Sequence, residues 1–177
     1  MSLGRLSNNR VRNNLDFIIT ATFSLFLFLS VVGFASLNTK NINWIFSGPN
    51  SDSTQAYLGW MDYLRDNWRF PIGKNPNMGL IPSNSIAYSD SIPLFAILFK
   101  ILVAHQEKNF QYFGIWLLIC FLMQGIFAVK LLRLFSNKLI FNILGAALFV
   151  LMPFWIDRTK LDRKSTRLNS SHANISY

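Results

Sequence analysis

The chain contains 177 residues, of which 51% are hydrophobic and 15% aromatic, and 17 of them are phenylalanine. This composition is too apolar for an ordinary soluble domain of the same length, so it indicates a membrane protein. The formal net charge is +9, but the cations lie in short segments beside hydrophobic runs, as the positive-inside rule predicts. No basic helix face or aromatic–basic motif supports nucleic-acid binding, so we expect no nucleic-acid partner.

The single cysteine, Cys120, lies inside an apolar run and has no partner for an intrachain disulfide. The sequence also lacks the Cys/His spacing of a metal site, a glycine-rich phosphate loop and an HExxH pattern. We therefore predict no metal ligands from motifs, and the cofactor stays unknown.

Residues 1–16 are polar and precede an apolar run at 17–37, which is long enough to cross a hydrocarbon core of ~30 Å. We predict a cytoplasmic N-terminus followed by a first transmembrane helix. A cleaved signal peptide is the alternative, because small residues lie near the end of the run, but the run exceeds the usual length of a signal-peptide core.

The long polar interval at 47–94 carries most of the distinctive residues and forms the main part of a predicted extracytoplasmic loop, residues 38–90. Within it, aromatic and aliphatic residues recur at helical spacing, which predicts an amphipathic helix over 53–68. We expect its apolar face to lie in the membrane interface. The alternative is a helix that packs on a soluble core. The apolar-face positions are Tyr57, Trp60, Met61, Leu64 and Trp68.

Three further apolar segments follow, at 91–104, 112–132 and 139–156. The first is short and contains Lys100, so we predict a juxtamembrane or re-entrant helix; the other two are predicted transmembrane helices. If 91–104 does not cross, the basic connector after the second span is cytoplasmic, as the positive-inside rule requires. A version in which 91–104 crosses is the alternative. The prediction is an all-α, polytopic membrane protein with about three transmembrane helices.

Asp52 is the first-ranked candidate for chemistry, because it follows the first span and begins the amphipathic helix where a membrane-embedded substrate would meet water. A purely structural role is equally supported, because Asp52 with Gln55 three positions later is an N-cap arrangement. The two roles are compatible, since a helix N-terminus stabilises a carboxylate.

Asp90 precedes the short helix that starts near Pro93, and it could either cap that helix or act as a substrate-binding acid. Arg65, Arg69 and Lys74 could bind a phosphate or pyrophosphate through charge-assisted hydrogen bonds. Pairing with nearby aspartates on the surface is the alternative for these cations.

The runs DSTQAYLGWMDYLRDNWRFPIG and SNSIAYSDSIPLFAILFK, placed after a first span, resemble the N-terminal part of a GT-C type membrane glycosyltransferase, and more closely an uncharacterised bacterial family near that superfamily. The resemblance covers residues 10–160. It implies transfer of a sugar from a polyprenyl-phosphate donor to an acceptor at the outer face of the bacterial inner membrane.

In such enzymes the early loop aspartate acts as general base or as part of a metal site, which the resemblance carries onto Asp52. The residues that flank Asp52 in this chain include no second acid, so the local spacing does not support a divalent metal. A polytopic transporter or envelope-assembly subunit without chemistry of its own is the alternative function.

Residues 162–177, DRKSTRLNSSHANISY, change composition abruptly and resemble the translation of a sequencing-library adapter. We expect this segment to be non-native and the chain to be a fragment of a longer protein, inactive by itself. A solvated basic tail is the alternative.

Overall fold

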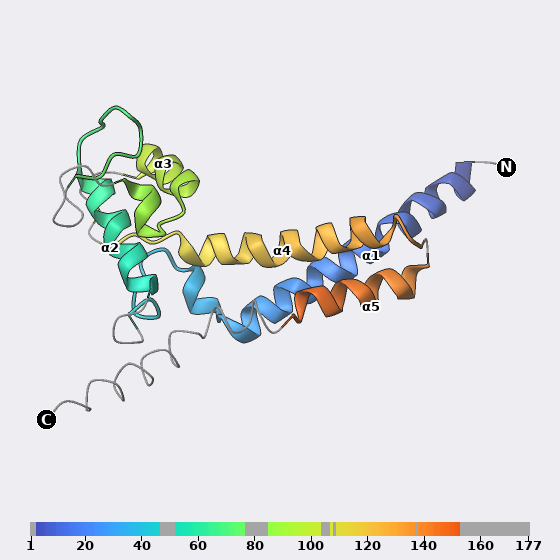
Figure 1. Cartoon of the computed structure of the whole chain (residues 1–177). Coiled ribbons are helices and arrows are strands. Elements are labelled where there is room, and N and C mark those ends of the chain that lie inside the picture. Colours follow the sequence, from blue (N-terminus) through green and yellow to red (C-terminus); the bar gives the residue numbers. More distant parts are fainter. Residues whose placement is uncertain are drawn as a thin grey trace, which may run out of the picture. The chain divides into compact units, whose positions relative to one another are not determined.

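The computed structural model describes residues 3–46, 52–76, 85–103, 107, 109–136 and 138–152, with backbone alone for 3–13 and Asp52. Within these residues every regular element is helical, apart from one isolated antiparallel bridge between Lys74 and Ser85. The predicted all-α class is therefore confirmed for the part of the chain that is described. The chain divides into two compact units. The described residues of one lie within Ala35–Gly114, which we call unit 2, and unit 1 contains the helices that precede and follow this segment in the sequence (Figure 1).

Helix α1 spans Leu3–Val31 and belongs to unit 1. It begins well inside the segment predicted as a separate polar N-terminus, 1–16, and it ends before the predicted limit at residue 37. The chain leaves the helix at Gly33, whose φ of 91° is a left-handed conformation that glycine adopts readily. A short 3₁₀ helix, η1 (Phe34–Leu37), follows, so the predicted run at 17–37 is two elements.

Helix α4 (Phe113–Leu132) and helix α5 (Leu139–Val150) complete unit 1. The Phe28 and Phe121 rings meet edge to face at 5.8 Å between centroids, which packs α1 against α4. At Gly125 of α4 a Cβ would collide with the Ser24 hydroxyl of α1, so the close approach of these helices requires glycine there.

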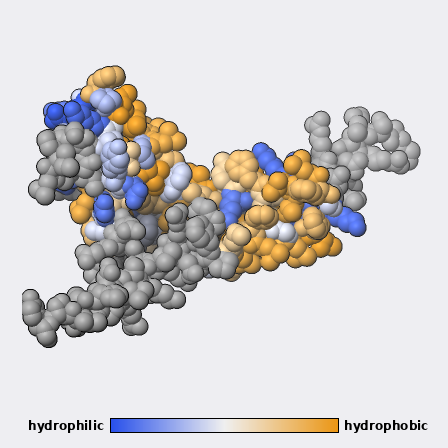
Figure 2. All heavy atoms as spheres, viewed as in Figure 1, coloured by the Kyte–Doolittle hydropathy of each residue, from blue (hydrophilic) through white to orange (hydrophobic). Residues whose placement is uncertain are grey.

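Two helices in the described residues are long and apolar enough to cross a membrane: α1 through Asn14–Val31, and α4. Helix α5 starts at the beginning of the predicted third span, 139–156, but it has 12 residues, and residues 153–156 lie outside the described part. Orange, apolar surface predominates over the described side chains of unit 1 (Figure 2). These helices support membrane association.

Unit 2 is built around helix α2 (Asp52–Arg65), the 3₁₀ helix η2 (Ile86–Ser89) and helix α3 (Pro93–Leu102). Its core is aromatic: the Trp60 ring meets the Tyr112 ring edge to face at 4.9 Å between centroids. The Trp60 indole N–H also donates to the Phe110 carbonyl at 2.9 Å. Tyr112 comes directly before α4, so the last residues of unit 2 complete its core.

The apolar face of α2 packs into this core, which corrects the expectation of an interfacial helix over 53–68. Trp60 and Leu64 are 0% exposed, and Tyr57 and Met61 are buried as well. The helix ends at Arg65, so Trp68 lies in the following loop rather than on the same face. Helical periodicity identifies an apolar face but cannot say whether protein or lipid covers it, and here the core of unit 2 covers it.

A set of hydrogen bonds ties the two ends of unit 2 together, and we call this the neck (Ser36–Thr39 with Gln111–Gly114). The Gln111 side-chain amide donates to the carbonyls of Ser36 at 2.7 Å and Asn38 at 2.9 Å. The Gln111 backbone N–H donates to the Thr39 carbonyl at 2.8 Å, and a Cβ at Gly114 would collide with the Ser36 carbonyl. The neck therefore fixes the point where the chain enters and leaves unit 2.

Candidate functional site

Asp52, the first-ranked candidate, is the first residue of α2. Its side chain lies outside the described part, so its partners and its capping role stay predictions. The helix start itself is held firmly, because the hydroxyls of Ser53 and Thr54 each donate to the Ile45 carbonyl at 3.2 Å. The backbone thus places residue 52 at the N-terminal end of a helix whose other face is buried, where the helix dipole favours a carboxylate.

Asp90 does not cap α3, which corrects one of its two predicted roles. It ends η2 in a left-handed conformation with φ of 53°, and the residue that precedes α3 is Ile92, which makes no side-chain cap. The cause is the next residue: the Ser91 hydroxyl donates to the Ala56 carbonyl at 2.6 Å, and its carbonyl accepts from the Tyr112 hydroxyl. These bonds hold Ser91 in the core and leave Asp90 exposed. Its substrate-binding role stays a prediction.

Pro93 occupies the first turn of α3, as predicted from its ability to start a helix. Ile92 adopts a φ of 51°, which is rare for a β-branched residue. Its carbonyl nevertheless accepts from the backbone N–H groups of Phe95 at 2.9 Å and Ala96 at 3.0 Å. The start of α3 is therefore set by its backbone hydrogen bonds and by Ser91.

Arg69 forms an ion pair with Asp66. This agrees with the alternative prediction that these cations pair with nearby aspartates. Its guanidinium donates to the two carboxylate oxygens at 2.8 and 3.1 Å. These hydrogen bonds lower the pKa of Asp66, and the Asn67 backbone N–H, which donates to the same carboxylate at 2.9 Å, acts in the same direction. Arg69 thus stabilises the turn after α2, and its side chain remains 47% exposed.

Lys74 lies in a tight turn that is tied to the rest of unit 2 on both sides. Gly73 has φ of 97°, and its carbonyl accepts from the Ile86 backbone N–H at 2.8 Å. The buried Asn75 side chain donates to the Gly59 carbonyl of α2 at 3.0 Å. Lys74 itself is half-buried, and its backbone position is well defined by these neighbours.

The structure brings Arg69 into a charged cluster with Asp66 and Lys100. Among the described residues, no hydrogen bond or ion pair joins Lys74, Asp90 or Arg65 to it. Arg65 is exposed at the end of α2. A phosphate site formed jointly by Arg65, Arg69 and Lys74 therefore stays a prediction.

The third member of this cluster is Lys100. From the sequence, this residue was used only to predict whether 91–104 crosses the membrane. It is 3% exposed and lies on the inner face of α3. Its ammonium donates to the Tyr63 carbonyl at 2.6 Å and lies 4.0 Å from the centroid of the Tyr63 ring and 5.0 Å from that of Trp68. Burial lowers the pKa of Lys100, the nearby Asp66 carboxylate opposes this, and Arg69 adds to it.

The arrangement satisfies Lys100 through a carbonyl, two aromatic faces and a nearby carboxylate, so it acts as a link between α2 and α3. One sequence signal could have revealed it. Lys100 lies four residues after Ala96, the other fully buried residue of α3, and a lone lysine at that spacing in an apolar helix requires a partner from another element.

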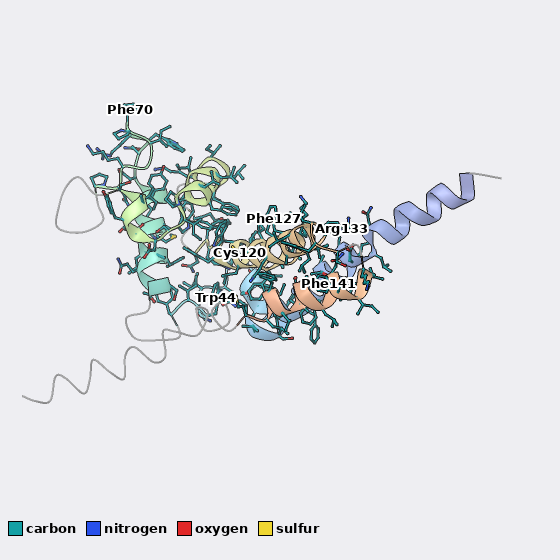
Figure 3. The ribbon with its side chains drawn as sticks, turned by 45° about the vertical axis from the view of Figure 1, so that its right-hand side comes forward. Trp44, Phe70, Cys120, Phe127, Arg133 and Phe141 are labelled. Carbon is teal, nitrogen blue, oxygen red and sulfur yellow. The ribbon has the colours of Figure 1, made fainter. Side chains whose placement is uncertain are left out.

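Unit 1 contains a second polar cluster, which joins all three of its helical segments. The Asp16 carboxylate of α1 accepts from the Arg133 guanidinium, with 2.9 Å between Nε and Oδ2, and from the Asn142 amide of α5 at 3.2 Å. Asp16 and Asn142 are each 2% exposed. The bonds place the start of the apolar part of α1 beside the end of α4 and the start of α5 (Figure 3). Consequently α4 runs opposite to α1, whereas α5 runs in the same direction as α1.

Within the described residues, no group of three His, Cys, Asp or Glu side chains lies close enough together to hold a metal ion. This finding does not include the side chain of Asp52, so the cofactor question stays open.

A family model described as Domain of unknown function (DUF6311) matches residues 21–163. The chain belongs to this family. The DUF6311 match includes all of unit 2, α4 and α5, and therefore all five predicted site residues, whereas Asp16 lies before it. No curated protein and no solved structure matches the chain. The family description gives no activity, so the function must be argued from the residues.

Proposed function

We propose that the chain is part of a multi-pass membrane glycosyltransferase in which unit 2 forms the extracytoplasmic platform and Asp52 is the catalytic base. The observation that carries the proposal is the position of Asp52 at the start of α2. The backbone of that helix is anchored through Ile45, and its inner face is buried by Trp60 and its neighbours. A base must be held in place to be effective, and this helix start is rigidly packed.

The Asp16–Arg133 ion pair supports the topology of the proposal. It brings the start of the α1 span beside the end of α4, so in the proposed protein these two helices cross the bilayer in opposite directions. Helix α3 has 10 residues, or about 15 Å at 1.5 Å per residue, about half of a hydrocarbon core. This length supports the version in which α3 does not cross, and then both the N-terminus and the basic connector are cytoplasmic, as the positive-inside rule prefers.

The proposed reaction is an attack on a lipid-linked sugar. An acceptor hydroxyl oxygen forms a bond to the anomeric carbon, the bond from that carbon to the phosphate oxygen breaks, and polyprenyl phosphate leaves with the electron pair. The Asp52 carboxylate takes the acceptor's proton, which contributes ~10²- to 10⁴-fold to the rate. Cations of the loop, with Arg65 and Lys74 as candidates, stabilise the departing phosphate.

The test is sugar transfer in membranes that contain the complete protein, supplied with a panel of radiolabelled polyprenyl-phosphate hexoses. Asp52→Asn should reduce transfer to a membrane acceptor by at least ~10²-fold at unchanged protein level. The matched control is Asp62→Asn, which changes a half-buried carboxylate on the same helix and should retain activity. Full activity in Asp52→Asn would refute the assignment of Asp52.

A further inference from the structure

The loop after α2 carries large apolar side chains at the surface of unit 2. Trp68 is 47% exposed, Phe70 is 91% exposed and Ile72 is 62% exposed. Figure 3 shows Phe70 at the far end of this loop. We call the segment Trp68–Ile72 the apolar tip. Groups of exposed apolar side chains mark interaction surfaces, because their exposure to water is unfavourable unless a partner covers them.

The apolar tip contacts α3 through Trp68, which meets the inner side of that helix. The Lys100 ammonium of α3 lies against the Trp68 ring, and Tyr63 meets Trp68 edge to face at 6.4 Å between centroids. Because Lys100 and Ala96 point inward, the opposite side of α3 is exposed. Its exposed apolar residues are Leu94, Leu98, Ile101 and Leu102, which are 48–75% exposed.

Cations accompany this surface. Arg69 lies inside the apolar tip and is half exposed, while Arg65 and Lys74 lie at either side of it in the sequence. Aromatic rings interleaved with Arg and Lys are typical of the region where a bilayer's acyl chains meet its phosphates. An unpaired cation of this kind contributes about 1 kcal/mol of attraction to an anionic leaflet, whereas Arg69 is already paired with Asp66.

Short connections join unit 2 to the two candidate spans. Helix α1 ends at Val31 and unit 2 begins at Ala35, while Tyr112 of the core directly precedes α4. If α1 and α4 cross a bilayer, unit 2 is therefore tethered to it at both ends by a few residues.

We propose that the apolar tip and the outer face of α3 form a bilayer-docking surface. Trp68, Phe70 and Ile72 insert at the boundary of the acyl chains, and Lys74 contacts lipid phosphate. This surface takes the role that sequence analysis assigned to α2. The inference rests on the membrane integration of α1 and α4 that is part of the proposed function.

The experiment places an environment-sensitive nitrobenzoxadiazole label at Phe70→Cys in the full chain, with Cys120→Ser removing the other thiol. The chain is reconstituted into phosphatidylcholine vesicles and into equimolar phosphatidylcholine–phosphatidylglycerol vesicles, each with and without a lipid that carries a nitroxide near its headgroup. Two controls are labelled in the same way: Gln55→Cys on the exposed side of α2, and Phe127→Cys, 57% exposed on α4.

We expect the Phe70→Cys label to emit at shorter wavelength and to be quenched by the shallow nitroxide, while the Gln55→Cys label stays quenchable by aqueous iodide. Lys74→Gln should remove the extra quenching that phosphatidylglycerol produces. A deep nitroxide should quench the Phe127→Cys label, which reports membrane integration independently.

If iodide quenches the Phe70→Cys label while lipid nitroxide quenches Phe127→Cys, docking is overturned and integration stands. A label at Phe70→Cys that is shielded from iodide yet insensitive to lipid nitroxide also overturns docking, because a protein then covers the tip. Absence of lipid quenching at Phe127→Cys overturns both proposals.

Discussion

The outward-facing residues of unit 1 include Phe26, Ile140 and Leu148, which are 66%, 71% and 71% exposed, whereas unit 2 buries Trp60 and Tyr112 completely. Unit 1 also places polar groups inside: its described buried residues include Asp16 and Asn142, which are hydrogen-bonded to each other. Two parts of one apolar chain thus use their side chains in different ways. Unit 1 is organised as expected for a lipid solvent, in which polar groups must find partners within the protein, while unit 2 has the aromatic core of a domain that folds in water.

The largest expected effect tests the buried aromatic core of unit 2. Trp60→Ala removes a fully buried indole and its hydrogen bond to the Phe110 carbonyl, which should cost about 3–5 kcal/mol of unfolding free energy. In detergent micelles, limited proteolysis should then cleave between residues 35 and 114 much faster, while unit 1 keeps its resistance. Leu58→Ala, at a side chain 52% exposed on the same helix, should change the cleavage rate little. Equal sensitivity of both variants would mean that unit 2 has no such core.

A smaller effect is expected at the polar cluster of unit 1. Arg133→Gln leaves the buried Asp16 carboxylate without its cation, and because Arg133 is 30% exposed the cost should be about 2–3 kcal/mol, below that of a fully buried pair. Thermal unfolding in detergent measures it. Lys130→Gln on the exposed side of α4 is the control. Adding Asp16→Asn to Arg133→Gln should recover part of the loss, and no recovery would show that the pair is not coupled.

The smallest effect concerns the Arg69–Asp66 ion pair of unit 2, in which Arg69 is 47% exposed and Asp66 is buried. Arg69 holds the pKa of Asp66 below its ordinary value of 3.8, so the pair stabilises the folded state above that value and the stabilisation is lost as the pH falls through the lower, folded-state pKa. Arg69→Gln should flatten the fall of the melting temperature below about pH 3.8. Lys40→Gln, at an exposed cation of unit 2, should leave the slope unchanged. If both variants show the same slope, the Arg69–Asp66 pair does not contribute to stability at low pH.

Features set by local chemistry could be predicted from the sequence. The all-helical class followed from composition and periodicity, α4 occupies nearly the whole predicted segment at 112–132, and Pro93 starts α3. Each depends on propensity or on an apolar run within one segment. The end of α1 was harder to predict, because the helix ends near Gly33 while the residues after it remain apolar.

Features that depend on distant residues could not be predicted. The apolar face of α2 was assigned to lipid because periodicity is the same for either environment, and only Tyr112 and Phe110, some 50 residues later, decide that it is buried. The partners of Lys100 and Asp16 likewise come from other elements. A cap on α3 is one of the two roles that the sequence predicts for Asp90, and the bond from Ser91 to Ala56 prevents it.

The neck has a consequence for how the protein is made. Ribosomes release the chain from its N-terminus, so residues 35–103 emerge before Gln111 and Tyr112, which close the neck and complete the aromatic core. The platform therefore stays unfinished until synthesis reaches the first turn of α4. On the proposed topology, the loop would be translocated as an open chain and would fold only when the ribosome has begun the helix that returns the chain to the cytoplasm.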